Sequence, residues 1–97
     1  MAESRDATPN ADDWAKIISV TEYYYASFAL HIKACPTISR NEYQVCVLTK
    51  LGMRAGDIAY LTGNSSSNIT NIRSRMMPKL FGEEGGAKDF DARISAL

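Results

Sequence analysis

The sequence predicts a single all-α domain built around a helix-turn-helix, with a long helix before it and a short helix after it. Three observations favour this fold. Apolar residues recur at helical spacing over 10–35, a capping box at Ser39 opens a second helix, and small residues within 54–80 suit a tight turn between two helices. No sustained alternation of apolar and polar residues indicates a strand. The 97 residues suffice for one modest core, so we expect 1–97 to form one domain.

The N-terminal third is predicted to be a polar arm followed by one long helix. Residues 1–9 are expected to be disordered, and Asn10 is a suitable N-cap for a helix over 10–35. Pro36 disfavours the helical conformation of the residue before it and so ends that helix. One stripe of this helix carries Trp14, Ile18, Thr21, Tyr25, Phe28 and Ile32. Its aromatic surface predicts core packing and an interface with a second subunit or a sensor domain, for which Tyr24, Tyr25 and Phe28 are the candidates.

The segment 38–80 is the predicted helix-turn-helix core. Ser39 and Glu42 form a capping box, and Gly52 ends the helix that they open. Further on, Gly63 supplies the left-handed conformation that reverses the chain, and Ser65 caps the helix after it. Ala59 is small enough to let the two helices of the helix-turn-helix approach closely, and their shared core is expected to contain Ile58, Ile69, Ile72, Met76 and Leu80.

The outward face of the second helix carries small polar groups and one arginine, and it has no acidic residue. Such a face suits a helix in the major groove of DNA, where hydroxyl, amide and guanidinium groups contact base edges and phosphates. A solvated surface without a ligand is the alternative. For Arg73, near the core direction, an ion pair within the domain is at least as expected as a phosphate contact. The candidate DNA-contacting residues are Ser66, Ser67, Thr70, Asn71, Ser74, Arg75, Lys79 and Arg54.

The segment 81–97 is predicted to be a loop followed by a short helix that begins near Ala87. Phe90, Ile94 and Leu97 share one face of this helix. Just before the loop, Pro78 removes one backbone hydrogen bond and is expected to kink or end the second helix of the core.

Composition narrows the classes of function. The formal net charge is zero, but 36–80 has six basic residues against two acidic ones, a net charge of +4. The middle of the chain can therefore present a basic surface. One histidine and two cysteines without CxxC spacing predict no metal site and no cofactor, and without a visible nucleophile–base pair we expect no enzyme activity. Cys35 and Cys46 are expected to be core thiols of a cytoplasmic protein, because the chain has neither a membrane span nor a secretion signal.

A resemblance to a known family rests on residues between Ile38 and Leu80. They are Ser39-Arg40-Asn41-Glu42, Val47-Leu48, Leu51-Gly52, Asp57-Ile58-Ala59, Leu61, Ser65, Ile69, Arg75-Met76 and Lys79-Leu80. This pattern resembles the output domain of LuxR/NarL-type regulators, and the segment after Lys79 is similar to a Bacteroides-type variant at the C-terminus of transcriptional regulators. The chain departs from the family pattern at Arg54, Thr70 and Pro78.

The resemblance implies sequence-specific binding of double-stranded DNA by the output domain of a bacterial transcriptional regulator. It also implies a sensor or repeat domain outside this chain, so the chain itself can be an excised domain. We expect a homodimer to bind two half-sites one helical turn apart. The alternative is a protein-protein interaction or dimerisation module on the same helix-turn-helix scaffold, for which the low total charge and Pro78 argue.

Overall fold

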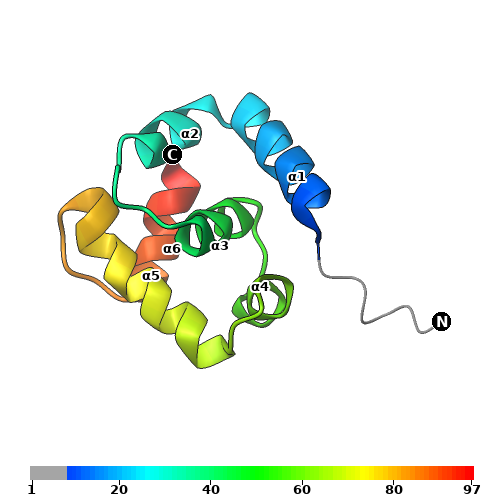
Figure 1. Cartoon of the computed structure of the whole chain (residues 1–97). Helices are drawn as coiled ribbons and strands as arrows, with labels where there is room; N and C mark the ends of the chain where they lie inside the picture. Colours follow the sequence, from blue (N-terminus) through cyan, green and yellow to red (C-terminus); the bar gives the residue numbers. More distant parts are fainter. Residues whose placement is uncertain (1–8) are drawn as a thin grey trace.

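The computed structural model describes residues 9–97, which form six helices and no strand (Figure 1). The all-α fold class is thus confirmed for this part of the chain. The predicted disordered arm at 1–9 lies, apart from Pro9, outside the described residues. The helices are α1 (Ala11–Tyr24), α2 (Ala26–Lys33), α3 (Arg40–Lys50), α4 (Ala55–Thr62), α5 (Ser66–Phe81) and α6 (Ala87–Ala96).

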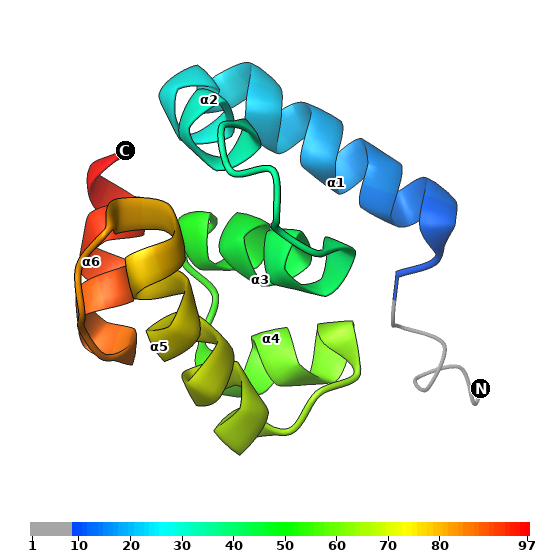
Figure 2. The same ribbon diagram turned by 60° about the vertical axis from the view of Figure 1, so that its left-hand side comes forward.

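Helix α3 is the centre of the domain and packs against α1, α4, α5 and α6. Figure 2 shows α1 and α2 on one side of α3, with α4 and α5 on the other. The core lies between these layers because each helix buries one apolar face there. Its fully buried large side chains include Phe28, Ile32, Leu48, Ile58, Ile69, Ile72, Met76 and Phe90.

The predicted single helix over 10–35 is wrong, because the chain forms two helices that meet at Tyr25 (Figure 1). The backbone of Tyr25 has φ −127° and ψ 63°, outside the helical region. Neither proline nor glycine marks this break in the sequence. Tertiary contacts hold it instead: the Lys50 ammonium lies 4.9 Å from the centre of the Tyr25 ring and also donates to the carbonyl oxygens of Ile94 and Ser95.

The break at Tyr25 also changes the predicted interface. Phe28 is 0% exposed and belongs to the core, so its assignment to an interface is wrong. Tyr24 and Tyr25 remain exposed. A bend at Tyr25 allows α2 to bury Phe28 and Ile32 while α1 packs against α3 in a different direction.

Helix starts and stops in the middle of the chain match the sequence predictions. Ser39 and Glu42 form the capping box of α3, with Ser39 Oγ 3.1 Å from the Glu42 backbone nitrogen. Gly52 has φ 85°, and the backbone N–H of Met53 after it donates to Leu48, the pattern of a Schellman motif. Helix α6 begins at Ala87 as predicted.

Pro78 does not end α5, which continues to Phe81. The Pro78 side chain is exposed, and the helix stops at Gly82, whose φ of 67° is left-handed. The N–H of Gly82 donates to the carbonyl oxygen of Pro78, so the last turn of the helix is closed despite the proline.

Candidate nucleic-acid interface

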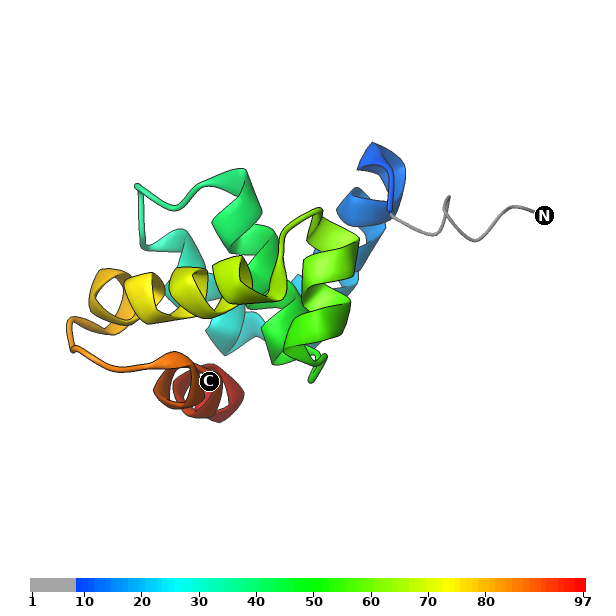
Figure 3. The same cartoon turned by 90° about the horizontal axis from the view of Figure 1, so that it is seen from below.

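Helix α5 exposes one polar face along most of its length. Figure 3 shows α5 running across the molecule in front of α3, with α4 near its N-terminal end. At about 100° per residue, its solvent-facing residues cover roughly half of the helix circumference. They include six of the eight sequence candidates, all exposed except the half-buried Ser74: Ser66, Ser67, Thr70, Asn71, Ser74 and Arg75. No acidic residue belongs to α5 at all.

The turn between α4 and α5 has the geometry that its sequence predicts. Gly63 has φ 73°, its N–H donates to Tyr60, and the N–H of Asn64 donates to Ala59, which completes a Schellman motif. Ser65 Oγ then accepts from the backbone N–H of Asn68 at 3.0 Å and caps α5. The start of α5 is therefore fixed relative to α4 by three short-range hydrogen bonds.

Three asparagines brace this turn against α3, and sequence reasoning missed them. Asn64 Nδ2 donates to Asn41 Oδ1 on α3 at 3.1 Å, and Asn68 Nδ2 on α5 donates to Asn64 Oδ1 at 2.7 Å. The only signal in the sequence was the amide side chain that follows Gly63, since asparagine commonly satisfies backbone groups in turns. These hydrogen-bonded amides link α3, the turn and α5, so they help to set the orientation of α5 relative to α3.

The cations near the C-terminal end of α5 meet a carboxylate of α3. Lys79 Nζ lies 2.7 Å from Glu42 Oε1, and Arg75 Nε lies 3.7 Å from Glu42 Oε2. The side chain of Lys79 is 26% exposed and that of Arg75 is 59% exposed, whereas the Glu42 side chain is 9% exposed. Lys79 is thus bound inside the domain, while Arg75 retains most of its contact with solvent.

The ionised form of Glu42 is stabilised by its partners. Burial alone would raise the pKa of this carboxyl. The hydrogen bonds from Lys79 and from the Ser39 backbone, with the charges of Lys79 and Arg75, outweigh burial and lower the pKa below 4.5. Glu42 therefore stays negatively charged at neutral pH and partly neutralises the charges of Lys79 and Arg75.

Two other arginines weighed in the sequence analysis, Arg73 and the candidate Arg54, lie away from the exposed face of α5. Arg73 is buried, and its guanidinium pairs with Asp91 on α6 at 3.4 Å, so the ion pair within the domain is confirmed. Burial raises the pKa of Asp91 above its ordinary value, although the nearby charge of Arg73 acts in the opposite direction. Arg54 is exposed just before α4. The length of α4 separates it from the turn by about 12 Å.

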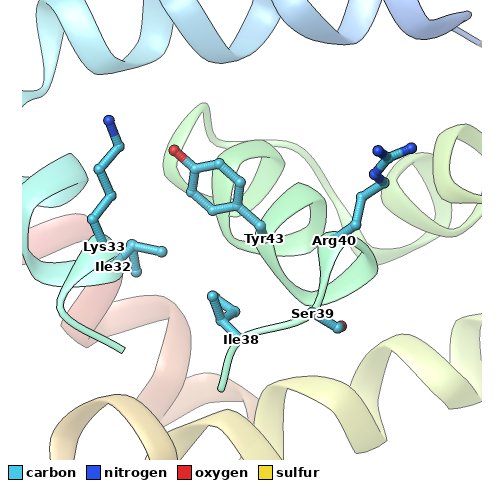
Figure 4. Close-up of a pocket in the computed structure, with 6 residues that line it drawn as sticks. All are labelled: Ile32, Lys33, Ile38, Ser39, Arg40 and Tyr43. Atoms are coloured by element: carbon cyan, nitrogen blue, oxygen red, sulfur yellow. The ribbon is translucent and has the colours of Figure 1, made fainter. Parts of the chain in front are cut away.

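A small apolar hollow of about 180 Å³ lies between α2 and α3, away from the face described above. Figure 4 shows two of its lining side chains, Lys33 and Tyr43, pointing toward α1. There both bind Glu22, which accepts a hydrogen bond from the Tyr43 hydroxyl and pairs with Lys33 at 3.2 Å. The Tyr43 hydrogen bond lowers the pKa of Glu22 most strongly, and burial together with Glu22 raises the pKa of Tyr43. These groups join α1, α2 and α3 and leave the hollow itself lined mainly by carbon atoms.

A second exposed surface is apolar and lies on α1. Val20 and Tyr24 are more than half exposed, and Leu51, at the end of α3, is also exposed. Ile17, Val20 and Leu51 line a groove whose other walls are Lys16 and Thr21. Residues 17, 20 and 24 follow helical spacing, so they form one continuous stripe. The predicted interface at Tyr24 thus belongs to a larger apolar surface than the sequence indicated.

Other site classes find little support in residues 9–97. They contain no group of three or more histidine, cysteine, aspartate or glutamate side chains placed to hold a metal ion. Within the same range, no helix has both the length and the apolar character needed to cross a membrane. No family model, curated protein or solved structure matches the chain.

Proposed function

We propose that this domain binds double-stranded DNA in a sequence-specific manner, with α5 as the helix that enters the major groove. The observation that carries the proposal is the exposed face of α5, which is polar, free of acid and held at a fixed angle by the turn before it. We further propose that the fold is a helix-turn-helix of the LuxR/NarL type. The domain would then be the output module of a cytoplasmic bacterial transcriptional regulator whose sensor or repeat domain lies elsewhere.

Asn71 is the side chain best suited to base recognition. It lies five residues after Ser66, about 7.5 Å along the helix from its start, within the part that docked recognition helices place nearest the bases. Asn71 is exposed, and its side-chain amide forms no hydrogen bond with any other residue in the range 9–97. A free asparagine amide can donate to and accept from the edge of adenine at the same time.

The neighbouring hydroxyls extend this contact surface. Thr70 is exposed on the flank of Asn71, with its hydroxyl 3.4 Å from the Ser66 carbonyl oxygen, a weak internal bond that a base or phosphate can replace. Ser66, Ser67 and Ser74 are small enough to let the helix approach the groove closely. Exposed Arg75, and exposed Arg54 just before α4, are the cations that we propose contact phosphates.

Because all three cations of α5 are paired within the domain, we infer that binding uses two copies. A homodimer that places two α5 helices in successive major grooves contacts half-sites one helical turn apart. The bound sequence is then expected to be a palindrome, because the symmetry of the dimer imposes its own symmetry on the site.

Fluorescence anisotropy with a randomised duplex pool, followed by rounds of selection, tests the proposal. We expect salt-sensitive binding and enrichment of a palindromic site, since phosphate contacts release counterions. Binding that is insensitive to salt, or a pool that stays random after selection, would contradict it.

A second candidate function is docking of two copies through α1, and the apolar stripe of Ile17, Val20 and Tyr24 favours it. In an antiparallel pair centred on Val20, Lys16 of one copy lies opposite Tyr24 of the other. Two-fold symmetry repeats this cation–π contact, so the stripe is complementary to itself. Sedimentation tests this docking: Val20→Glu should dissociate the dimer, and Ser19→Glu, a change of equal charge beside it, should not.

A further inference from the structure

We propose that Glu42 restrains the sequence-independent part of DNA binding by holding the cations of α5 inside the domain. The inference rests on the proposed function and adds a determinant of specificity to it. Glu42 itself contacts no DNA in this account and acts only through Lys79 and Arg75.

All three cations of α5 are paired with carboxylates of the same chain. Arg73 pairs with Asp91, while Lys79 and Arg75 pair with Glu42. The exposed face of α5 therefore contributes neutral hydroxyl and amide groups together with a partly neutralised Arg75. A recognition helix with this composition gains little from phosphates, whose attraction is the same for every sequence.

The position of Glu42 makes it an effective restraint. Its side chain is 9% exposed and its carboxylate also accepts a hydrogen bond from the backbone N–H of Ser39 at 2.9 Å, as part of the capping box of α3. Because the backbone of α3 fixes the carboxylate, Glu42 cannot follow a cation that moves toward DNA. A phosphate must instead draw Lys79 away from a charged partner 2.7 Å distant.

The two cations are restrained to different degrees. Arg75 is 59% exposed and lies 3.7 Å from Glu42, so its guanidinium can turn to a phosphate with a small loss. Lys79 is mostly covered and closely held, so it contributes little to phosphate binding while Glu42 is ionised. This differs from the sequence-based expectation for Lys79, which treated its charge as free.

The test is the salt dependence of duplex binding by the full chain with Glu42→Gln. Glutamine can replace glutamate in a capping box, so the variant keeps the start of α3 and loses only the charge. Because Arg75 can already reach a phosphate in the wild type, the substitution newly frees Lys79 and should steepen the log–log salt slope by about 0.9 per bound copy. Between 50 and 200 mM salt, this amounts to an additional loss of affinity of about 3.5-fold. Affinity for random duplex at low salt should rise, and the ratio of specific to random binding should fall.

Glu22→Gln is the matched control, because it changes the net charge equally but removes a carboxylate bound to Tyr43 and Lys33 instead of α5. Its slope should equal that of the wild type. Equal slopes for the Glu42 and Glu22 variants, in a wild type that binds duplex, would overturn the inference and leave the proposed function standing. Absence of duplex binding by the wild type and both variants would overturn the two together.

A second variant tests the restraint with Glu42 in place. Lys79→Gln in the otherwise unchanged chain should leave the salt slope within a few tenths of the wild-type value. A slope shallower by about 0.9 per bound copy would mean that Lys79 already contacts a phosphate, and would overturn the inference. This test remains decisive if Glu42→Gln fails to fold.

Discussion

Replacing Phe28 by alanine should destabilise the domain severely, although its sequence pattern made it a candidate for an interface. The side chain is 0% exposed and belongs to the central core cluster together with Ile32. Truncation of a buried phenylalanine removes its apolar contacts and leaves a cavity, at a cost of about 3–5 kcal/mol. A small domain has a total free energy of unfolding of about 5–15 kcal/mol, so the variant loses a large part of it.

Urea denaturation followed by circular dichroism measures this loss. With a denaturant slope of about 1.5 kcal/mol per M, the midpoint should fall by roughly 2–3 M. Tyr24→Ala is the matched control, because Tyr24 is 71% exposed one turn earlier in the chain. Its free energy of unfolding should change by no more than about 0.5 kcal/mol. Equal losses in both variants, or a Phe28 variant that dissociates without losing stability, would refute the assignment of Phe28 to the core.

Three further predictions concern the caps, the turn and pH. Ser39→Ala should lower the free energy of unfolding by about 1 kcal/mol in urea, because the first turn of α3 loses its side-chain acceptor; no change would contradict the capping role. Gly63→Ala should cost about 1–2 kcal/mol at φ 73°, whereas Gly56→Ala, within α4, should stabilise the domain by about 0.5–1 kcal/mol; the same sign for both would be inconsistent with the turn. Since the folded-state pKa of Glu42 is lowered, its stabilisation is complete above the ordinary value of 4.5 and is lost as pH falls through the folded-state pKa; acid titration of Glu42→Gln should show a smaller loss in that range than the wild type.

Local signals in the sequence predicted the middle of the fold well, because caps and turns depend on neighbouring residues. The capping box at Ser39, the left-handed Gly63 and the cap at Ser65 all lie where the sequence places them. The break at Tyr25 was not predictable by the same means. It depends on Lys50, which comes from α3 and also binds the carbonyl groups of α6. Periodicity reports which faces are apolar, and it carries no information on such distant contacts.

In the candidate site, too, features set by neighbouring residues were predictable and contacts between distant residues were not. Helical spacing predicted that Thr70 and Asn71 face outward, and both are exposed. Spacing could not show that Glu42 lies against Lys79, since 37 residues separate them and only the packing of α3 on α5 joins them. Counting charges along the sequence therefore overstated the free positive charge of the middle segment.

Binding of Asn71→Ala to the selected duplex tests the central claim, recognition of bases by the exposed face of α5, most directly. Ser19→Ala on α1 serves as the control, because it removes an exposed polar group far from α5 in the chain. Loss of one bidentate base contact costs about 1–3 kcal/mol, so the preference for the selected site over a scrambled one should fall by roughly 5- to 150-fold in the Asn71 variant alone. An Asn71→Ala protein that keeps the full wild-type preference would contradict the account.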